Sequence, residues 1–135
     1  MVLLLFISKN SIAFSTENKD SSSINDVYRY IKCIGILYPD IVLKQAIWET
    51  GWFKSKHARF KNNLFGFRYS KKYMEFGSWR SCIDYYKNWQ IRKYTDTTED
   101  YYSFLIRIKY ATSTKYISSL KSLKVKIPDV ECNEK

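Results

Sequence analysis

The chain carries the sequence QAIWETGW at residues 45–52 and the sequence NNLFGF at residues 62–67. The first stretch has the pattern of the end of a largely apolar helix, and the second that of a polar and aromatic loop. Val42, Ala46 and Glu49 are four and three positions apart, so they share one stripe of the helix and Glu49 projects from its packed side. Burial raises the pKa of a carboxyl group and lets it donate a proton near neutral pH. The two stretches therefore predict a general acid at the edge of a cleft.

The less specific interpretation of Glu49 is a carboxylate in the last helical turn that simply reaches water. A negative charge at that end opposes the helix dipole by roughly 0.3–1 kcal/mol, so the position needs some other reason. We place this helix at Ile41 to Thr50, with Asp40 as its N-terminal cap and Gly51 as its stop.

The periodicity of apolar residues predicts a mainly α domain with one short β-hairpin. Ser78 is the expected cap of one helix, and Thr97 forms an expected capping box with Asp100 for another. A basic connection is expected over residues 54–61, and the tail from Lys124 is expected to fray. The expected helices cover residues 24–37, 41–50, 78–93, 97–108 and 115–123, and the expected strands cover residues 67–69 and 73–76.

The length and composition are those of one globular domain. The chain has 135 residues, of which 27% are charged and 45% hydrophobic, so it can bury a core without being disordered. Aromatic residues reach 18%. Two interpretations fit this excess: the rings fill the core, or they line a carbohydrate cleft, where flat rings cover the apolar faces of sugars.

The net charge is +10, from 23 basic and 13 acidic residues. A basic surface attracts an anionic partner such as nucleic acid, an anionic membrane face or an anionic cell wall. The basic residues are spread along the chain, so a solvated basic face is the alternative to a dedicated patch. His57 is the only histidine and is expected at the surface, and four glycines form no phosphate-binding loop. We therefore expect neither a metal site nor a cofactor.

The N-terminal apolar run from Met1 to Ile7 is too short to span a bilayer, and small residues follow at Ala13 to Ser15. This pattern predicts a cleaved secretory signal and no stable membrane anchor, with a buried N-terminal segment as the alternative. The expected divisions are a signal peptide over residues 1–15, a polar linker over 16–23, the folded domain over 24–124 and a polar tail over 125–135.

The three cysteines, Cys33, Cys82 and Cys132, match no zinc or redox spacing. Cys33 and Cys82 fall within helical apolar patterns and are expected to be buried free thiols. In an exported protein one pair of the three can form a disulfide, and the sequence leaves open which pair.

The chain resembles the glucosaminidase family of peptidoglycan hydrolases, glycoside hydrolase family 73 of the flagellar-rod and autolysin type. The resemblance lies in QAIWETGW, NNLFGF and the later Tyr110-Ala111-Thr112, in that order, within about residues 24–123. It implies a lysozyme-like helical domain with endo-β-N-acetylglucosaminidase activity, which cleaves the β-1,4 bond after N-acetylglucosamine. Its implied partner is the peptidoglycan glycan strand, its location is the periplasm, the cell wall or the medium, and it is expected to be a monomer.

The resemblance also implies roles for single residues. Glu49 matches the general acid, and Tyr110 matches a tyrosine that faces the acid across the cleft. Many members hold a second catalytic carboxylate in a long lobe, whereas this chain has a short segment there with Glu75 as its one acid, which aligns poorly. A single-acid mechanism, completed by the substrate acetamido group or a water held by Tyr110, is compatible with that. The expected substrate-binding residues are Trp52, Asn63, Phe65, Gly66 and Tyr69, and core packing is the alternative for Trp52, Phe65 and Tyr110.

Three other functions remain open from the sequence. A lytic transglycosylase also needs one glutamate and would leave a 1,6-anhydro end. A glycan-binding domain without catalysis would keep the aromatic cleft and the basic face. A nucleic-acid binder would stack its exposed aromatics on bases, but no recognition motif supports it, so no nucleic-acid partner is expected.

Overall fold

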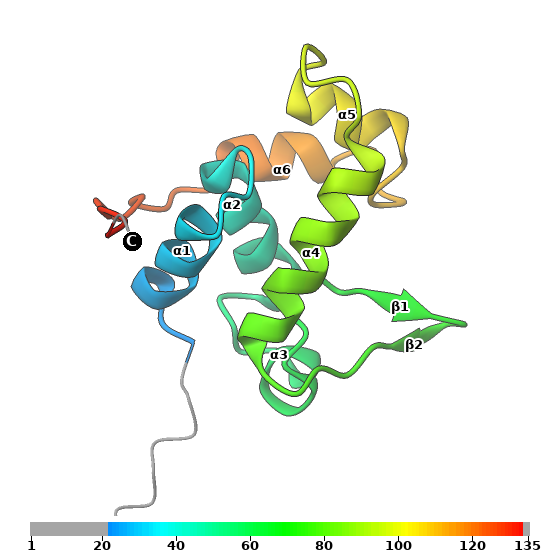
Figure 1. The fold of residues 1–135 in the computed structure, drawn as a ribbon. Coiled ribbons are helices and arrows are strands. Elements are labelled where there is room, and N and C mark those ends of the chain that lie inside the picture. Colours follow the sequence, from blue (N-terminus) through cyan, green and yellow to red (C-terminus); the bar gives the residue numbers. More distant parts are fainter. Residues whose placement is uncertain (1–21, 134–135) are drawn as a thin grey trace, which may run out of the picture.

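The computed structural model describes residues 22–133, so the predicted signal peptide and most of the predicted linker lie outside it. Within this part of the chain the helices pack around one core, and a two-stranded hairpin projects to one side (Figure 1). The predicted mainly α fold with one short hairpin is confirmed. The elements are α1 (Ile24–Cys33), α2 (Pro39–Thr50), α3 (Lys56–Lys61), β1 (Arg68–Tyr69), β2 (Lys72–Tyr73), α4 (Trp79–Lys93), α5 (Tyr101–Arg107) and α6 (Tyr116–Ser122).

Helix α2 lies in the middle of the core. Its side chains Val42, Leu43, Ala46 and Ile47 are fully buried, and it packs against both α1 and α6. Burying each large aliphatic side chain stabilises the fold by about 1.5–3 kcal/mol. The helix is therefore held firmly in place, and a side chain at its C-terminal end has a fixed position.

Helix α1 ends at Cys33, earlier than the predicted end at Leu37. Gly35 adopts a left-handed φ of 83°, and its N–H and that of Ile36 bond back to carbonyl groups of the last helical turn. Glycine takes this conformation without a steric penalty, so it ends the helix before the apolar pattern ends.

Helix α2 begins at Pro39, and the prediction that Asp40 caps it is wrong. The preceding residue is Tyr38, which has a left-handed φ of 53° and gives no side-chain cap. Proline suits the first helical position because its φ is already helical and it lacks an N–H that would be unbonded there. Asp40 instead accepts a hydrogen bond from the Tyr28 hydroxyl at 2.5 Å, which links α2 to α1.

Two other predictions of helix position are wrong. The segment predicted as a basic connection contains α3, whose cap is Ser55, with its hydroxyl accepting from the Ala58 N–H. Helix α5 is capped by Asp100, whose carboxylate accepts from the Ser103 N–H, and not by Thr97. In both cases a capping side chain directly before the helix satisfies the free N–H groups of the first turn.

The hairpin is shorter than predicted, with two residues in each strand. Arg68 pairs with Tyr73 in an antiparallel register, and Ser70 and Lys71 form the turn with φ of 47° and 67°. Two successive left-handed residues are typical of tight hairpin turns. The following helix, α4, begins after Ser78, whose hydroxyl caps it as predicted.

The C-terminal segment packs on α1, so the prediction that it frays is wrong. Cys132 forms a disulfide with Cys33, Val130 is buried, and the Lys32 ammonium donates to the Val130 carbonyl at 2.7 Å. The prediction of a free buried thiol is therefore wrong for Cys33 and confirmed for Cys82. Cys33 lies on the exposed side of the last turn of α1, which the apolar pattern did not indicate.

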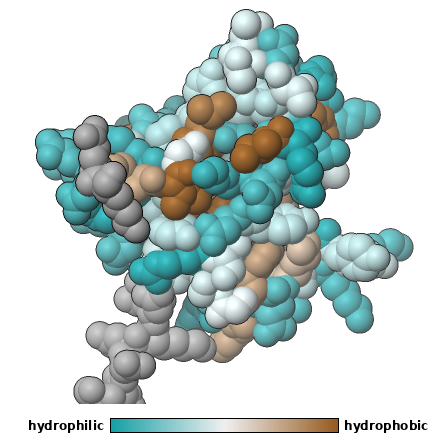
Figure 2. Space-filling model, in the orientation of Figure 1, coloured by the Kyte–Doolittle hydropathy of each residue, from teal (hydrophilic) through white to brown (hydrophobic). Residues whose placement is uncertain are grey.

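The surface is polar over most of the face seen in Figure 2, with hydrophobic residues in small separate patches. Between residues 22 and 133 no helix has the length and apolar character needed to cross a membrane.

Candidate active site

Glu49 lies in the last turn of α2, and its side chain is half-buried. The helix stops at Gly51, as predicted, and Trp52 and Phe53 continue in the left-handed region with φ of 62° and 65°. Thr50 holds this turn, because its buried hydroxyl donates to a carbonyl one turn earlier and accepts from the Phe53 N–H at 2.8 Å. Left-handed residues other than glycine cost about 1–2 kcal/mol each, so the Glu-Thr-Gly-Trp sequence forms a strained turn directly after the acid.

Gly66 lies directly against the Glu49 carboxyl group. A Cβ atom at this position would come within 3.0 Å of Oε2 of Glu49, and the φ of Gly66 is 68°. Both observations exclude a larger residue without a shift of the loop. The NNLFG loop therefore brings its backbone close to the acid at this glycine.

Asn63 holds the loop and the hairpin together. Its side chain is fully buried; its amide group donates to the carbonyls of Phe67 at 2.8 Å and Met74 at 3.0 Å, and its oxygen accepts from the Phe67 N–H. Both amide protons are thus used inside the protein. The structure places Asn63 behind the site, with no free donor for a ligand.

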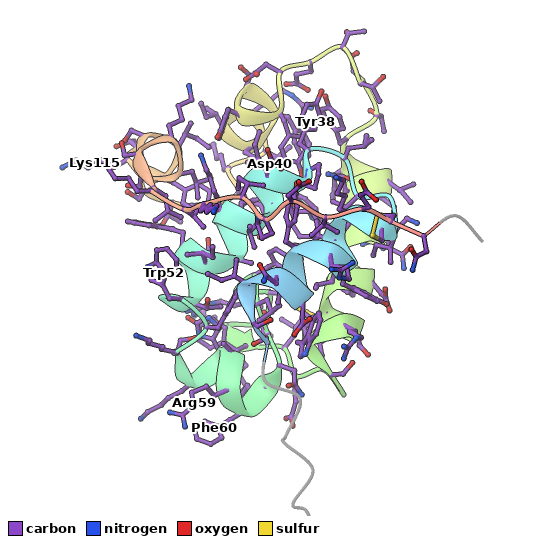
Figure 3. The ribbon with its side chains drawn as sticks, turned by 90° about the vertical axis from the view of Figure 1, so that its left-hand side faces the viewer. Tyr38, Asp40, Trp52, Arg59, Phe60 and Lys115 are labelled. Atoms are coloured by element: carbon purple, nitrogen blue, oxygen red, sulfur yellow. A yellow bond between two sulfur atoms is a disulfide. The ribbon has the colours of Figure 1, made fainter. Side chains whose placement is uncertain are left out.

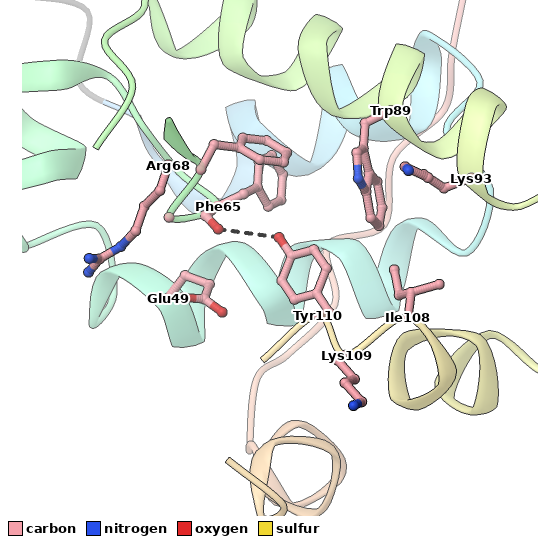
Figure 4. Close-up of a pocket in the computed structure, with 10 residues that line it drawn as sticks. Glu49, Phe65, Arg68, Trp89, Lys93, Ile108, Lys109 and Tyr110 are labelled. Atoms are coloured by element: carbon pink, nitrogen blue, oxygen red, sulfur yellow. Dashed lines mark hydrogen bonds between the residues drawn. The ribbon is translucent and has the colours of Figure 1, made fainter. Parts of the chain in front are cut away.

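A pocket with a volume of about 430 Å³ opens beside Glu49 (Figure 4). Tyr110 stands near its middle, and its hydroxyl donates to the Phe65 carbonyl at 3.2 Å. The loop and the segment after α5 are thus joined across the pocket. The residues that line it are Glu49, Phe65, Gly66, Phe67, Arg68, Trp89, Lys93, Ile108, Lys109 and Tyr110.

Burial raises the pKa of Glu49. A hydrogen bond from the Tyr116 hydroxyl and the charge of Arg68 act in the opposite direction but are smaller. Desolvation disfavours the ionised form of a carboxyl group, so the group stays protonated to a higher pH than in water. This is the electrostatic property that the sequence predicted for Glu49.

A buried hydrogen-bond network lies behind the acid. The Tyr116 hydroxyl accepts from the Gln45 amide at 3.3 Å, the Gln45 oxygen accepts from the Tyr86 hydroxyl at 2.5 Å, and the hydroxyls of Tyr86 and Tyr101 are 2.6 Å apart. Buried polar groups that are satisfied in this way fix one arrangement of the core. The network holds Tyr116, and through it Glu49, in a defined position.

His57 is half-buried, so its prediction as a surface residue is wrong. Its ring stacks on Tyr73 with centroids 4.3 Å apart, and Nε2 lies 3.1 Å from the Glu49 carbonyl oxygen. Arg68 lies over the same tyrosine, 4.2 Å from its ring centroid. These contacts attach the hairpin to the end of α2.

Besides Asn63, three of the predicted site residues do not line the pocket. Trp52 is 43% exposed and points outward from the molecule (Figure 3). Tyr69, on the hairpin, is 80% exposed. Glu75 is exposed beyond β2. The structure therefore brings Glu49 together with Phe65, Gly66 and Tyr110, and leaves these three outside.

The sequence analysis did not identify Arg68, Trp89, Lys93, Lys109 or Tyr116 as site residues. The lysines were attributed only to a general basic surface. One available signal was that Lys109 directly precedes the Tyr-Ala-Thr motif. Tyr116 carried no such signal, because its contact with Glu49 depends on how α6 packs against α2.

The described part of the chain offers no group of three or more histidine, cysteine, aspartate or glutamate side chains that could hold a metal ion. The pocket presents one half-buried carboxyl group, the Tyr110 hydroxyl, basic side chains and aromatic rings. On a mainly helical scaffold, a carboxyl group with a raised pKa beside an aromatic pocket is the arrangement of a glycoside hydrolase.

The comparison with protein families agrees with this class. The model of the Glucosaminidase family, described as mannosyl-glycoprotein endo-beta-N-acetylglucosaminidase, matches residues 24–127. The chain belongs to this family, and its domain is that of a peptidoglycan endo-β-N-acetylglucosaminidase. No curated protein and no solved structure matched the chain.

Proposed function

We propose that Glu49 is the general acid of this endo-β-N-acetylglucosaminidase. The observation that carries the proposal is the position of its carboxyl group, half-buried at the wall of the pocket with its pKa raised by burial. A carboxyl group that remains protonated can give its proton to the leaving oxygen of a glycosidic bond.

Glycosidic cleavage also needs stabilisation of the positive charge that develops at the anomeric carbon. Glu49 is the one carboxylate among the described residues that line the pocket, since Glu75 lies outside it. This supports a single-acid mechanism, in which the substrate acetamido group or a bound water provides the second function. Tyr110 suits this role because its hydroxyl donates to the Phe65 carbonyl, which leaves its oxygen lone pairs free to accept from the substrate or a water.

Binding of the sugar is proposed to use the pocket walls. Trp89 and Tyr110 present aromatic rings 5.4 Å apart between centroids at an angle of 74°, which gives two flat surfaces of different orientation. Gly66 leaves space beside the acid. Trp52 and Tyr69 lie outside this pocket but at the surface, where they remain candidates for contact with a longer glycan.

Export to the cell wall or the medium follows from a substrate that lies outside the cytoplasm. The Cys33–Cys132 disulfide supports this location, because such bonds persist in oxidising compartments. We retain the signal peptide over residues 1–15 as the proposed route. We also propose that the protein acts as a monomer.

Digestion of purified peptidoglycan followed by mass spectrometry of the products tests the activity. We expect soluble fragments that end in reducing N-acetylglucosamine. Fragments with a 1,6-anhydro end would identify a lytic transglycosylase instead. Binding to the cell wall without any product would identify a binding domain and overturn the enzymatic proposal.

A further inference from the structure

The pocket has two chemically different ends. In the view of Figure 4, Glu49 and Arg68 lie toward one end and Lys93 and Lys109 toward the other, with Tyr110 between them. Lys93 is the last residue of α4, and Lys109 follows α5. Two lysines from separate elements therefore line the part of the pocket beyond Tyr110, at separate points of its wall. We call this pair the lysine end.

The backbone of Lys109 is in an unusual conformation for a lysine. Its φ is 53°, its N–H bonds to the Ile106 carbonyl at 3.1 Å, and the Tyr110 N–H bonds to the Leu105 carbonyl at 3.0 Å. This is the hydrogen-bond pattern that ends many helices, and glycine is the usual residue at the left-handed position. At the end of α1 the same pattern uses Gly35.

A side chain kept at a left-handed position destabilises the fold relative to glycine, and such strain is concentrated at functional sites. Lys109 is exposed, so packing does not explain why a side chain is retained there. Its place in the pocket wall does offer a reason. The conformation and the location are independent observations that point to use of the ammonium group.

The lysine end also lacks a balancing negative charge. Among residues 22–133, no aspartate or glutamate forms an ion pair with Lys93 or Lys109. Glu49 is the only acid among the described residues that line the pocket, against three basic residues, Arg68, Lys93 and Lys109. The pocket therefore has a positive potential that is directed at its contents.

We propose that the lysine end binds a carboxylate of the substituent carried by the peptidoglycan glycan strand, and so favours anionic over neutral glycan. The inference rests on the proposed glycosidase function of the same pocket. A backbone of N-acetylated sugars is uncharged, so the anion must come from the substituent: the carboxylates of the peptide, or the lactyl carboxylate where no peptide is attached. Trp89, beside Lys93, supplies a flat surface for the sugar that bears it.

The test compares kcat/KM on native peptidoglycan fragments with kcat/KM on the same fragments after carbodiimide and methylamine have converted their carboxylates to neutral amides. We expect the wild-type protein to prefer the native fragments roughly five- to tenfold. The double variant Lys93→Gln/Lys109→Gln should cleave both at equal rates. The double variant Lys124→Gln/Lys126→Gln loses the same charge outside the pocket and should keep the full preference.

A third substrate distinguishes the two sources of the carboxylate. Glycan strands freed of peptide by an amidase retain the lactyl carboxylate only. If the wild-type protein still prefers these strands over their amidated form, the lysine end binds the lactyl carboxylate. If that preference disappears, it binds a carboxylate of the peptide.

The variant Lys109→Gly separates the function of this side chain from a structural role. Glycine relieves the left-handed strain, so we expect Tm to rise by roughly 2–6 °C while the preference for anionic fragments falls. Two results would overturn the inference while the glycosidase function stands. One is that the wild type cleaves native and amidated fragments equally well. The other is that the Lys124→Gln/Lys126→Gln control loses as much preference as Lys93→Gln/Lys109→Gln. Absence of any cleavage by the wild type would overturn both.

Discussion

Glu49 and Glu75 lie on the two sides of the hairpin in sequence, and their surroundings differ in almost every respect. Glu49 lies in the last turn of a buried helix, faces Gly66 and lines the pocket. Glu75 follows β2, is exposed and lies outside the pocket. The residue type is the same, so the proposed difference in role comes from burial and position alone.

The same comparison explains why one acid is held more firmly than the other. Glu49 is fixed by the packing of α2 and by the network that reaches it through Tyr116. Glu75 lies next to a hairpin of two-residue strands, which buries little apolar surface. A group that must stay within hydrogen-bonding distance of a glycosidic oxygen needs to be held by packing and hydrogen bonds, as Glu49 is.

The largest expected effect is that of Glu49→Gln. We expect the rate of release of soluble fragments from peptidoglycan to fall about 10²- to 10⁴-fold, because the amide cannot donate the proton. Binding of the variant to the cell wall should persist. Retention of more than a tenth of the wild-type rate would remove Glu49 from its proposed role.

The stability of Glu49→Gln gives an independent check. The pKa of Glu49 is higher in the folded than in the unfolded protein, so the folded state is favoured by this group at low pH and loses that advantage as pH rises through the raised pKa. At neutral pH the uncharged amide should therefore leave the free energy of unfolding unchanged or higher. A marked loss in urea unfolding would indicate a structural role instead.

Gly66→Ala should have the next largest effect. The added Cβ would lie 3.0 Å from the Glu49 carboxyl oxygen at a left-handed φ, so the loop or the acid must shift. We expect about a 10- to 100-fold loss in kcat/KM, since small displacements of a catalytic group are costly. Gly77→Ala is the matched control, because a Cβ there meets no atom within 4 Å. Equal activity of the two variants would contradict the close approach.

Tyr116→Phe should change the pH dependence more than the maximal rate. The Tyr116 hydroxyl lowers the pKa of Glu49 by hydrogen bonding, so its removal should raise that pKa further. The loss of activity on the alkaline side should move to higher pH, with a change in rate of only a few-fold. Tyr102→Phe is the control. If the alkaline limb of the pH–rate profile does not move in Tyr116→Phe, the hydrogen bond from Tyr116 to Glu49 does not influence the catalytic pKa.

The Cys33–Cys132 disulfide should affect stability and not catalysis. It joins residues 99 positions apart, and we expect Cys33→Ser to lower the free energy of unfolding by about 2–4 kcal/mol. Activity at low temperature should be retained, because the bond lies away from the pocket lining. Urea unfolding with and without a reductant checks this, since reduction should affect the wild type but not the variant.

The smallest expected effect is that of Glu75→Gln. Its exposed position outside the pocket predicts activity within about twofold of the wild type. A loss as large as that of Glu49→Gln would show that the hairpin closes over the substrate and brings a second carboxylate into the site.

Local sequence patterns predicted those parts of the fold that local forces decide. The apolar stripe that carries Glu49, the stop at Gly51 and the Ser78 cap each depend on a few neighbouring residues. The start of α5 was mispredicted because both Thr97 and Asp100 can cap a helix, and α3 was missed because six residues are too few to show a helical apolar period.

The rest of the site could not be predicted because it depends on long-range packing. Tyr116 reaches Glu49 only through the packing of α6 on α2, and Lys93 and Lys109 line one pocket only because α4 and α5 end beside it. Asn63 was predicted to bind substrate, but the carbonyl groups of the hairpin occupy its amide protons. The disulfide likewise joins two cysteines that are 99 positions apart in the sequence, so no local pattern indicates the pair.

The most direct measurement is a titration of the Glu49 carboxyl group by ¹³C NMR, with Glu49→Gln used to assign its resonance, alongside the pH dependence of peptidoglycan cleavage. We expect a pKa above the ordinary value of 4.5, and a loss of activity at the pH where that resonance titrates. A Glu49 that is ionised at its ordinary pKa or below, with cleavage continuing above that pH, would contradict its role as the general acid.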